Sequence, residues 1–229
     1  MKRLLLLVLL CLWVPVVSAQ DSEPMIRIYG ALENPVNISY SEFMELPLVS
    51  VNASCICVGS PPENPGLNSF VVYTYNWTGV RLVDILDLVE PTEDAVDMKF
   101  GDFTLYSSSI PIEEINSENM ILAVYADGET LNRDQGYPFR VVLPCYWGYK
   151  WVKYVSYIEV TNYDHKGYWE SHGYPDDGRI PDCVPIAENP EVFTNKAMTL
   201  IVLGGLLIVY SIYLAPKKKS ARKKEVKVM

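Results

Sequence analysis

"FRVVLPCYWGYKWVKYVSYIEV", Phe139 to Val160, is the stretch that does most to decide the fold. Its first part, up to Tyr146, is strongly apolar and predicts a strand. From Lys150 to Tyr163 apolar and polar residues alternate, which predicts a second strand. Gly148 lies between the two and allows close approach of the backbone. Basic side chains stand at the start of the first strand, at Arg140, and around its end, at Lys150 and Lys153.

The rest of the chain reads as short strands with a few short helices. Sequence patterns predict strands at Met25–Gly30, Leu48–Val58, Phe70–Trp77, Met98–Ile110 and Met120–Leu131, the last with a tight turn at Asp127-Gly128. Helices are expected at Ser39–Leu46 and Arg81–Val89 because of a capping serine and of helical apolar spacing, respectively. We therefore predict an α+β fold with a β-rich mixed sheet rather than parallel βαβ units.

Both ends of the chain carry targeting signals. Residues 1–19 have a basic start, a short apolar run and a small-residue cleavage pattern, which predicts a secretory signal peptide; the alternative is an uncleaved anchor. Residues 197–215 contain no charge and are long enough to cross a bilayer, so we expect one C-terminal transmembrane helix. Residues 216–229 are strongly basic, which predicts a cytoplasmic tail. Residues 188–196 read as a stalk, so the cell-membrane protein exposes an ectodomain, residues 20–187, outside the cell or in the periplasm.

The charge of the exported part limits its partners. Residues 20–196, the ectodomain with its stalk, contain 10 of the 19 basic and 27 of the 28 acidic residues, which leaves them near −17, whereas the tail is near +6. An acidic surface repels nucleic acid, so we expect no nucleic-acid partner.

Four cysteines remain after the predicted signal: Cys55, Cys57, Cys145 and Cys183. Disulfides are permitted outside the cell, and four cysteines allow three pairings. The sequence leaves open whether Cys57 is a metal ligand or part of a structural disulfide, and whether Cys55 pairs with Cys145 or Cys183. Three N-glycosylation sequons, at Asn37, Asn52 and Asn76, fit an exported surface.

Several of these segments together resemble a known family. The segments "IRIYGALENPVNISYSEFMELP", "CVG" at Cys57–Gly59, "YNWTGVRLVDIL", "DQGYPFRVVLPCYWGYKWVKYVSYIEV" and "DHKGYWESHGYPDDGRIP" occur in the order of the molybdopterin-binding oxidoreductase domain. This is the fold shared by sulfite oxidases and the catalytic subunit of bacterial methionine-sulfoxide reductase. The resemblance covers nearly the whole ectodomain. It implies a mostly β fold that binds molybdenum through a pyranopterin dithiolene.

The resemblance also implies site residues. Cys57 falls at the position of the molybdenum ligand, and a soft thiolate suits such a metal; Cys55 is then accessory. The pterin and its phosphate would be held by fixed positive charge and by backbone or amide groups. The matching positions are Gln135, Arg140, Gly148, Tyr149, Lys150 and Lys153. His165 and His172 fall in a structural closing loop.

The expected enzyme transfers an oxo group in a two-electron reaction with a small-molecule substrate. An arginine-rich anion pocket is not evident, which disfavours sulfite. The chain has no motif for electron relay, so a membrane quinone or cytochrome is the expected electron partner. The alternative is a cofactor-free surface binding module of the same fold, in which Cys55 and Cys57 are bridged to other cysteines and the basic cluster is a solvated face of a strand pair.

Overall fold

The computed structural model describes residues 23–59, 66, 68–102, 104–115, 118–183 and 192–193 of the 229-residue chain. The predicted signal peptide, transmembrane helix and tail lie outside the described residues, as does most of the stalk. Within the described part of the chain, no helix is long and apolar enough to cross a membrane.

The first sheet has five strands in the order β2-β1-β10-β5-β6. β1 and β10 run parallel, and every other neighbouring pair in this sheet is antiparallel. The strands are β1 (Met25–Gly30), β2 (Val36–Ser39), β5 (Asp97–Gly101), β6 (Ser107–Pro111) and β10 (Tyr157–Thr161). This sheet joins the beginning and the end of the domain, because β1 pairs with β10.

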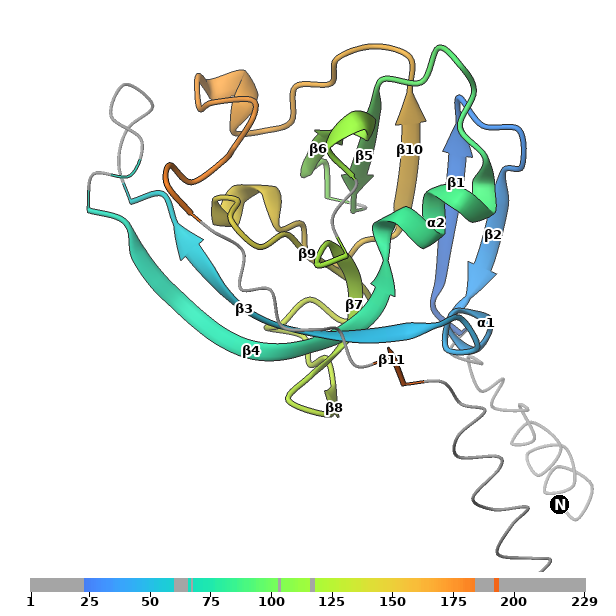
Figure 1. The fold of residues 1–229 in the computed structure, drawn as a ribbon, viewed down its shortest axis with the longest axis horizontal. Coiled ribbons are helices and arrows are strands. Elements are labelled where there is room, and N and C mark those ends of the chain that lie inside the picture. Colours follow the sequence, from blue (N-terminus) through green and yellow to red (C-terminus); the bar gives the residue numbers. More distant parts are fainter. Residues whose placement is uncertain are drawn as a thin grey trace, which may run out of the picture.

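The second sheet is antiparallel, with the order β11-β3-β4-β7-β8, and β9 pairs with β7. Its strands are β3 (Leu48–Cys57), β4 (Phe70–Arg81), β7 (Ile121–Ala126), β8 (Glu129–Thr130), β9 (Arg140–Val142) and β11 (Val192–Phe193). β3 and β4 form a long curved ribbon that runs below the first sheet and α2 in the view of Figure 1. The end of β3 at Cys57 lies far along this ribbon from the end that pairs with β11.

The helices are short and are explained by local sequence. α1 (Tyr40–Phe43) begins at Ser39, whose side chain and that of Glu42 form a capping box. α2 (Leu82–Val89) buries Leu82, Ile85, Leu86 and Val89 on one face, as the helical spacing predicts. The 3₁₀ helices are η1 (Ile112–Glu114), η2 (Gly148–Lys150) and η3 (Glu170–His172). The β-rich mixed fold predicted from the sequence is confirmed.

The strands predicted between Phe139 and Tyr163 are too long. Only Arg140–Val142 and Tyr157–Thr161 are strands, and they belong to different sheets. The residues between them cross from one sheet to the other and fold back, with Val141 N–H donating to Val152 C=O at 2.9 Å. Trp151, Val152 and Val155 are buried in this crossing, so their apolar character comes from a buried loop and not from one face of a strand.

Candidate functional site

A cavity of about 750 Å³ opens beside the end of β3. Four parts of the chain form its walls: the end of β3 with the start of β4, the loop between β5 and β6, β9 with the crossing segment that follows it, and the segment after β10. The lining residues are Cys55, Cys57, Val58, Gly59, Val72, Tyr73, Asp102, Tyr106, Arg140, Gly148, Tyr149, Trp151, Lys153, Tyr154, Trp169 and Tyr174. Five of the seven predicted site residues are among them: Cys57, Arg140, Gly148, Tyr149 and Lys153. Gln135 and Lys150 are not.

Cys55 and Cys57 lie at the end of β3, and both line the cavity. Between Cys55 and Ile56 the partner on β4 passes from Tyr73 to Val71, so the extra residue of this irregularity, Val72, lies in β4. Cys55 is buried, whereas Cys57 is partly exposed. Burial raises the pKa of the Cys55 thiol, and hydrogen bonding to Tyr73 opposes this effect. Cys57 is therefore the more accessible of the two sulfurs.

The structure decides the disulfide pairing that the sequence left open. Cys145 and Cys183 form a disulfide, and Cys55 and Cys57 are free thiols. A bridge from Cys55 to Cys145 or Cys183, and a structural disulfide at Cys57, are therefore both wrong for this structure. The cofactor-free alternative depended on such bridges and loses that support. The bridge instead ties Cys183, after the closing segment, to the crossing segment that lines the cavity.

Arg140 supplies a buried positive charge at the cavity. Its side chain is 1% exposed and is surrounded by aromatic rings, with the guanidinium carbon 4.9 Å from the centre of the Tyr73 ring and 5.2 Å from that of Trp77. It donates hydrogen bonds to the Gln135 carbonyl oxygen, at 2.8 Å, and to the Tyr73 hydroxyl. Its Nε is buried and has no hydrogen-bond partner among the described residues. None of the ion pairs within the described chain involves Arg140.

Lys153 lines the same cavity and adds a second positive charge. Its Nζ donates to the Asp134 carbonyl oxygen at 2.6 Å. Burial lowers the pKa of Lys153, and the nearby Arg140 lowers it further. The charge of Asp134 opposes this shift. A buried guanidinium and a nearby ammonium that line one cavity favour the binding of an anion.

Gln135 has a different place from the one predicted. Its side-chain Oε1 accepts a hydrogen bond from Asn132 N–H, and its own N–H donates to Asn132 Oδ1, both at 3.0 Å. The side chain therefore closes the turn before β9. Its main-chain carbonyl, which receives Arg140, is the part of this residue that contacts the site.

Gly148 and Tyr149 belong to η2, which packs directly against the end of β3. A Cβ atom on Gly148 would lie 2.9 Å from Cys55 Sγ and 3.1 Å from the Ile56 carbonyl oxygen, so only glycine fits without displacing the strand end. Tyr149 donates its hydroxyl hydrogen to the Pro175 carbonyl oxygen at 2.6 Å, and its own carbonyl accepts from the Tyr106 hydroxyl at 2.5 Å. Burial raises the pKa of both tyrosines. They are therefore neutral hydrogen-bonding groups in this wall.

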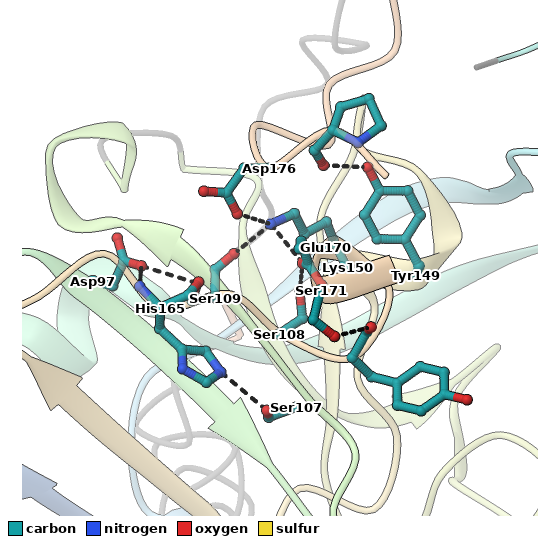
Figure 2. Close-up of polar contacts among 12 residues, drawn as sticks. Asp97, Ser107, Ser108, Ser109, Tyr149, Lys150, His165, Glu170, Ser171 and Asp176 are labelled. Atoms are coloured by element: carbon teal, nitrogen blue, oxygen red, sulfur yellow. Dashed lines mark hydrogen bonds and ion pairs between the residues drawn. The ribbon is translucent and has the colours of Figure 1, made fainter. Parts of the chain in front are cut away.

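Lys150 is not among the lining residues and forms a buried ion pair with Glu170 (Figure 2). Its Nζ lies 2.8 Å from Glu170 Oε1 and 3.8 Å from Asp176 Oδ1, and it donates to the Ser109 carbonyl oxygen at 3.1 Å. The side chains of Lys150 and Glu170 are at most 2% exposed. Ser108 Oγ also donates to Glu170 Oε1, at 2.5 Å. The resemblance placed Lys150 on the cofactor, whereas the structure has it joining η2 to η3.

A second polar cluster fastens the closing segment to β6 (Figure 2). Asp97 Oδ2 accepts from His165 N–H at 2.8 Å and from Ser109 Oγ at 3.0 Å. His165 Nε2 lies 3.0 Å from Ser107 Oγ. These contacts agree with the prediction that the His165 segment closes the structure.

The sequence did not identify the aromatic side chains of the cavity that come from outside the crossing segment. Tyr73, Tyr106, Trp169 and Tyr174 come from β4, the loop before β6, and the closing segment. Only the pairing of these segments brings the rings together, so local patterns could not have indicated them. Trp169 and Tyr174 also contact each other, with ring centres 5.4 Å apart.

Comparison with known proteins agrees with this geometry. The model of the oxidoreductase molybdopterin binding domain family matches residues 12–169, and the chain belongs to this family. An uncharacterized oxidoreductase of Bacillus subtilis, YuiH, is 25% identical over 65% of this chain and 71% of its own length. Sulfite oxidase of Arabidopsis thaliana is 25% identical over 70% of this chain. This chain covers only 47% of that relative.

A solved structure shares the fold. The sulfane dehydrogenase SoxCD from Paracoccus pantotrophus superposes with a TM-score of 0.53 at 21% identity, over 61% of this chain and 38% of that one. The family assignment confirms the recognition made from the sequence and supports an oxidoreductase with a molybdenum–molybdopterin cofactor.

Proposed function

We propose that this protein is a membrane-anchored, extracytoplasmic oxidoreductase in which Cys57 ligates the molybdenum of a molybdopterin cofactor. The reaction would be a two-electron oxo transfer to or from a small molecule. The observation that supports this most is the meeting of a partly exposed free thiol, Cys57, with the buried and incompletely paired Arg140 in one cavity.

The residues present fit the cofactor. A free thiolate is a soft ligand of the kind that molybdenum accepts. Arg140 retains an unpartnered buried N–H, which an isolated structural arginine would be expected to satisfy. Gly148 lets the η2 backbone pack directly against the end of β3, because a Cβ atom at this position would lie 2.9 Å from Cys55 Sγ. When bound, the cofactor would supply a metal that changes oxidation state by two and exchanges an oxo group.

The chain's own residues would bind and orient the cofactor. Cys57 would hold the metal from the end of β3, and Arg140 and Lys153 would hold a phosphate oxygen of the pterin. Tyr149 and Gly148 would form the wall against which the pterin lies, with Gln135 acting through its carbonyl on Arg140. The rings of Trp169 and Tyr174 would limit the access of water to the cavity.

The proposed compartment and electron partner are inferred from the sequences at the two ends of the chain. The apolar run at 197–215, the basic tail and the leader pattern support an anchored protein with its domain outside the cytoplasm. A disulfide between Cys145 and Cys183 is compatible with an oxidising compartment. A membrane quinone or a cytochrome would exchange electrons with the domain.

Elemental analysis tests the proposal. The full chain is expressed in a host that makes the molybdenum cofactor, and molybdenum is measured per purified chain. We expect about one molybdenum atom per chain in the wild type and at least tenfold less in Cys57→Ser, the loss expected when a metal ligand is removed. Cys55→Ser is the matched control and should keep its molybdenum. A wild type without molybdenum, or a Cys57→Ser variant that retains it, would contradict the proposal.

A further inference from the structure

We propose that one group of aromatic rings at the cavity binds the positively charged part of the substrate, so that the substrate is a small organic cation and not an oxyanion. The inference rests on the proposed function, whose substrate class it specifies. It starts from the rings at the cavity, which fall into two groups with charges of opposite sign beside them. The first ring group is Tyr73, Trp77 and Trp151, and the second ring group is Tyr106, Tyr149, Trp169 and Tyr174.

The first ring group already surrounds a cation of the protein itself. The guanidinium carbon of Arg140 lies within 6.0 Å of the centres of all three rings. The electron-rich faces of these rings are thereby paired with a positive charge. In the proposed function, Arg140 and Lys153 hold the phosphate of the pterin. This end of the cavity therefore belongs to the cofactor.

The second ring group is held together by contacts among its own members. The ring centre of Tyr174 lies 5.4 Å from that of Trp169 and 5.7 Å from that of Tyr149. Tyr106 joins the group through Tyr168, whose ring contacts those of Tyr106 and Trp169. Among the described residues, no lysine or arginine lies over the rings of Tyr106, Tyr149 or Trp169. These ring faces are therefore available to a cation from outside, and Trp169, which is 39% exposed, is the most accessible of the three.

The hydroxyl groups of the second ring group are poorly suited to an oxyanion. Tyr106 donates its hydroxyl hydrogen to the Tyr149 carbonyl oxygen, and Tyr149 donates its own to the Pro175 carbonyl oxygen. An oxyanion substrate needs hydrogen-bond donors, and these two are already in use within the protein. A methylated ammonium group needs no donor, and aromatic faces bind it directly.

A carboxylate stands beside these rings in the cavity lining. The N–H of Asp102 donates to the Tyr106 carbonyl oxygen at 3.3 Å, which keeps the two residues together, and both line the cavity. The carboxylate of Asp102 accepts hydrogen bonds from the N–H and the hydroxyl of Thr104, both at 2.7 Å. No ion pair within the described chain joins Asp102 to a basic side chain. Its negative charge is therefore available to balance a bound cation.

The buried charges next to the second ring group add to this effect. Lys150 is the cation of that cluster, and it faces two carboxylates, Glu170 and Asp176 (Figure 2). Glu170 Oε2 is buried and accepts no hydrogen bond from any described residue. Burial is the main cause of the raised pKa of Tyr106 and Tyr149, and the charge of Glu170 is the largest electrostatic contribution to both. The second ring group thus lies in a negative field, which stabilises a cation.

The cavity leaves an oxyanion substrate little positive charge to bind. Among the described lining residues, the cations are Arg140 and Lys153, and in the proposed function both contact the cofactor phosphate. The exported part of the chain, near −17, also repels small anions and concentrates small cations. The local and the overall charge therefore favour the same substrate class.

Isothermal titration calorimetry of the full chain tests the inference. Choline is the cationic probe, its neutral carbon analogue dimethylbutanol has nearly the same shape, and sulfate is the anionic probe. The detergent is non-ionic, because phosphocholine head groups would compete with choline. We expect choline to bind at least about tenfold more tightly than dimethylbutanol, and more tightly than sulfate in the molybdenum-loaded chain.

Two variants, each with a matched control, locate the binding. Trp169→Leu and Asp102→Asn should each reduce the preference for choline over dimethylbutanol at least about threefold. Tyr163→Leu also removes an exposed ring, and Glu33→Gln removes an exposed charge, but neither residue lines the cavity, so both should keep the preference. Thermal unfolding midpoints of all four variants show whether each is folded.

Three results would overturn the inference: dimethylbutanol that binds as tightly as choline, sulfate that binds the molybdenum-loaded chain more tightly, or no binding of choline. Folded Trp169→Leu and Asp102→Asn variants that both keep the full preference would also do so. Molybdenum content, measured separately on the same samples, tests the proposed function. A chain that holds molybdenum but lacks the preference for choline leaves the proposed function standing and removes the cation site. A chain that shows the preference but never holds molybdenum contradicts the proposed function and keeps the cation site.

Discussion

At the scale of single residues, a substitution at Arg140 tests whether this side chain stabilises the fold or binds the cofactor. It has no carboxylate partner in the described chain, so replacement by methionine removes a buried charge and two hydrogen bonds without leaving an ion unpaired. We expect Arg140→Met to change the free energy of unfolding of the empty protein by at most about 2 kcal/mol. Cofactor affinity should fall about 10- to 100-fold, as expected for loss of a charged hydrogen bond.

Urea denaturation and molybdenum content of the same samples check both parts. Arg133→Met is a suitable control, because Arg133 lies on an exposed turn and does not line the cavity. A large loss of stability with normal molybdenum content in Arg140→Met would show that the arginine is structural.

His165 gives the closing segment a pH dependence. Its pKa is lowered mainly by burial and secondly by Lys99, while Glu170, Asp97 and Glu159 oppose the shift. The unfolded chain therefore binds a proton at a higher pH than the folded chain does. Stability from this group is fully present above the unfolded pKa of about 6.5 and is lost as the pH falls to the folded pKa. The slope cannot exceed about 1.4 kcal/mol per pH unit for one proton.

Urea denaturation between about pH 7.5 and pH 5.5, a range that brackets the ordinary histidine pKa, tests this effect. The His165→Gln variant should lose less stability over this range than the wild type. Other titrating groups are common to both proteins, so only the difference is interpreted. Parallel curves would show that His165 does not contribute.

At the scale of elements, the buried pair Lys150–Glu170 holds η2 against η3. Removing one partner leaves the other charge buried, which typically costs about 3–5 kcal/mol. We expect such a loss in Lys150→Met and in Glu170→Met, measured by urea denaturation. The double variant should recover most of it, because replacing a whole buried pair by apolar groups is often neutral. Additive losses in the double variant would mean that the two side chains do not act as a pair.

Some elements could be predicted from local sequence patterns, whereas the segment that crosses between the sheets could not. The capping serine of α1, the apolar face of α2 and the strands β1, β3 and β7 follow from local spacing and were predicted near their observed bounds. The segment from Leu143 to Ser156 was not, because consecutive buried side chains in a crossing loop look like a strand when read locally. The burial of Lys150 depends on Glu170, twenty residues away, and no local pattern announces such a pair.

In the candidate site, too, some residues were predicted correctly from the sequence and other features appeared only in the structure. Cys57, Arg140, Gly148, Tyr149 and Lys153 were named from the resemblance, and the structure brings them to one cavity. The resemblance did not show that Cys55 lines the cavity as well. It also did not show that Gln135 contacts Arg140 through its main-chain carbonyl. The disulfide pairing required the three-dimensional proximity of Cys145 and Cys183, whose Cα atoms are 5.4 Å apart.

At the scale of the whole molecule, the two apolar ends make different predictions about membrane attachment. If residues 197–215 form the anchor, a variant that ends at Lys196 should be released from membranes, because the apolar residues that would fill the bilayer are gone. The full chain should stay with the membrane after washing at high salt and alkaline pH. A variant that lacks only residues 216–229 is the control, since it keeps the apolar run and should remain in the membrane fraction.

The same experiment decides between the two readings of the N-terminus. If the variant that ends at Lys196 is soluble, and mass spectrometry shows that its leader has been removed, the first apolar run is a cleaved signal. Its thermal unfolding midpoint should then equal that of the full chain, because the described core, the Cys145–Cys183 bridge and the cavity lie before Lys196. If the variant stays with the membrane and keeps Leu4 to Val17, the N-terminal run is the anchor, and the C-terminal apolar run is not needed to hold the domain at the bilayer.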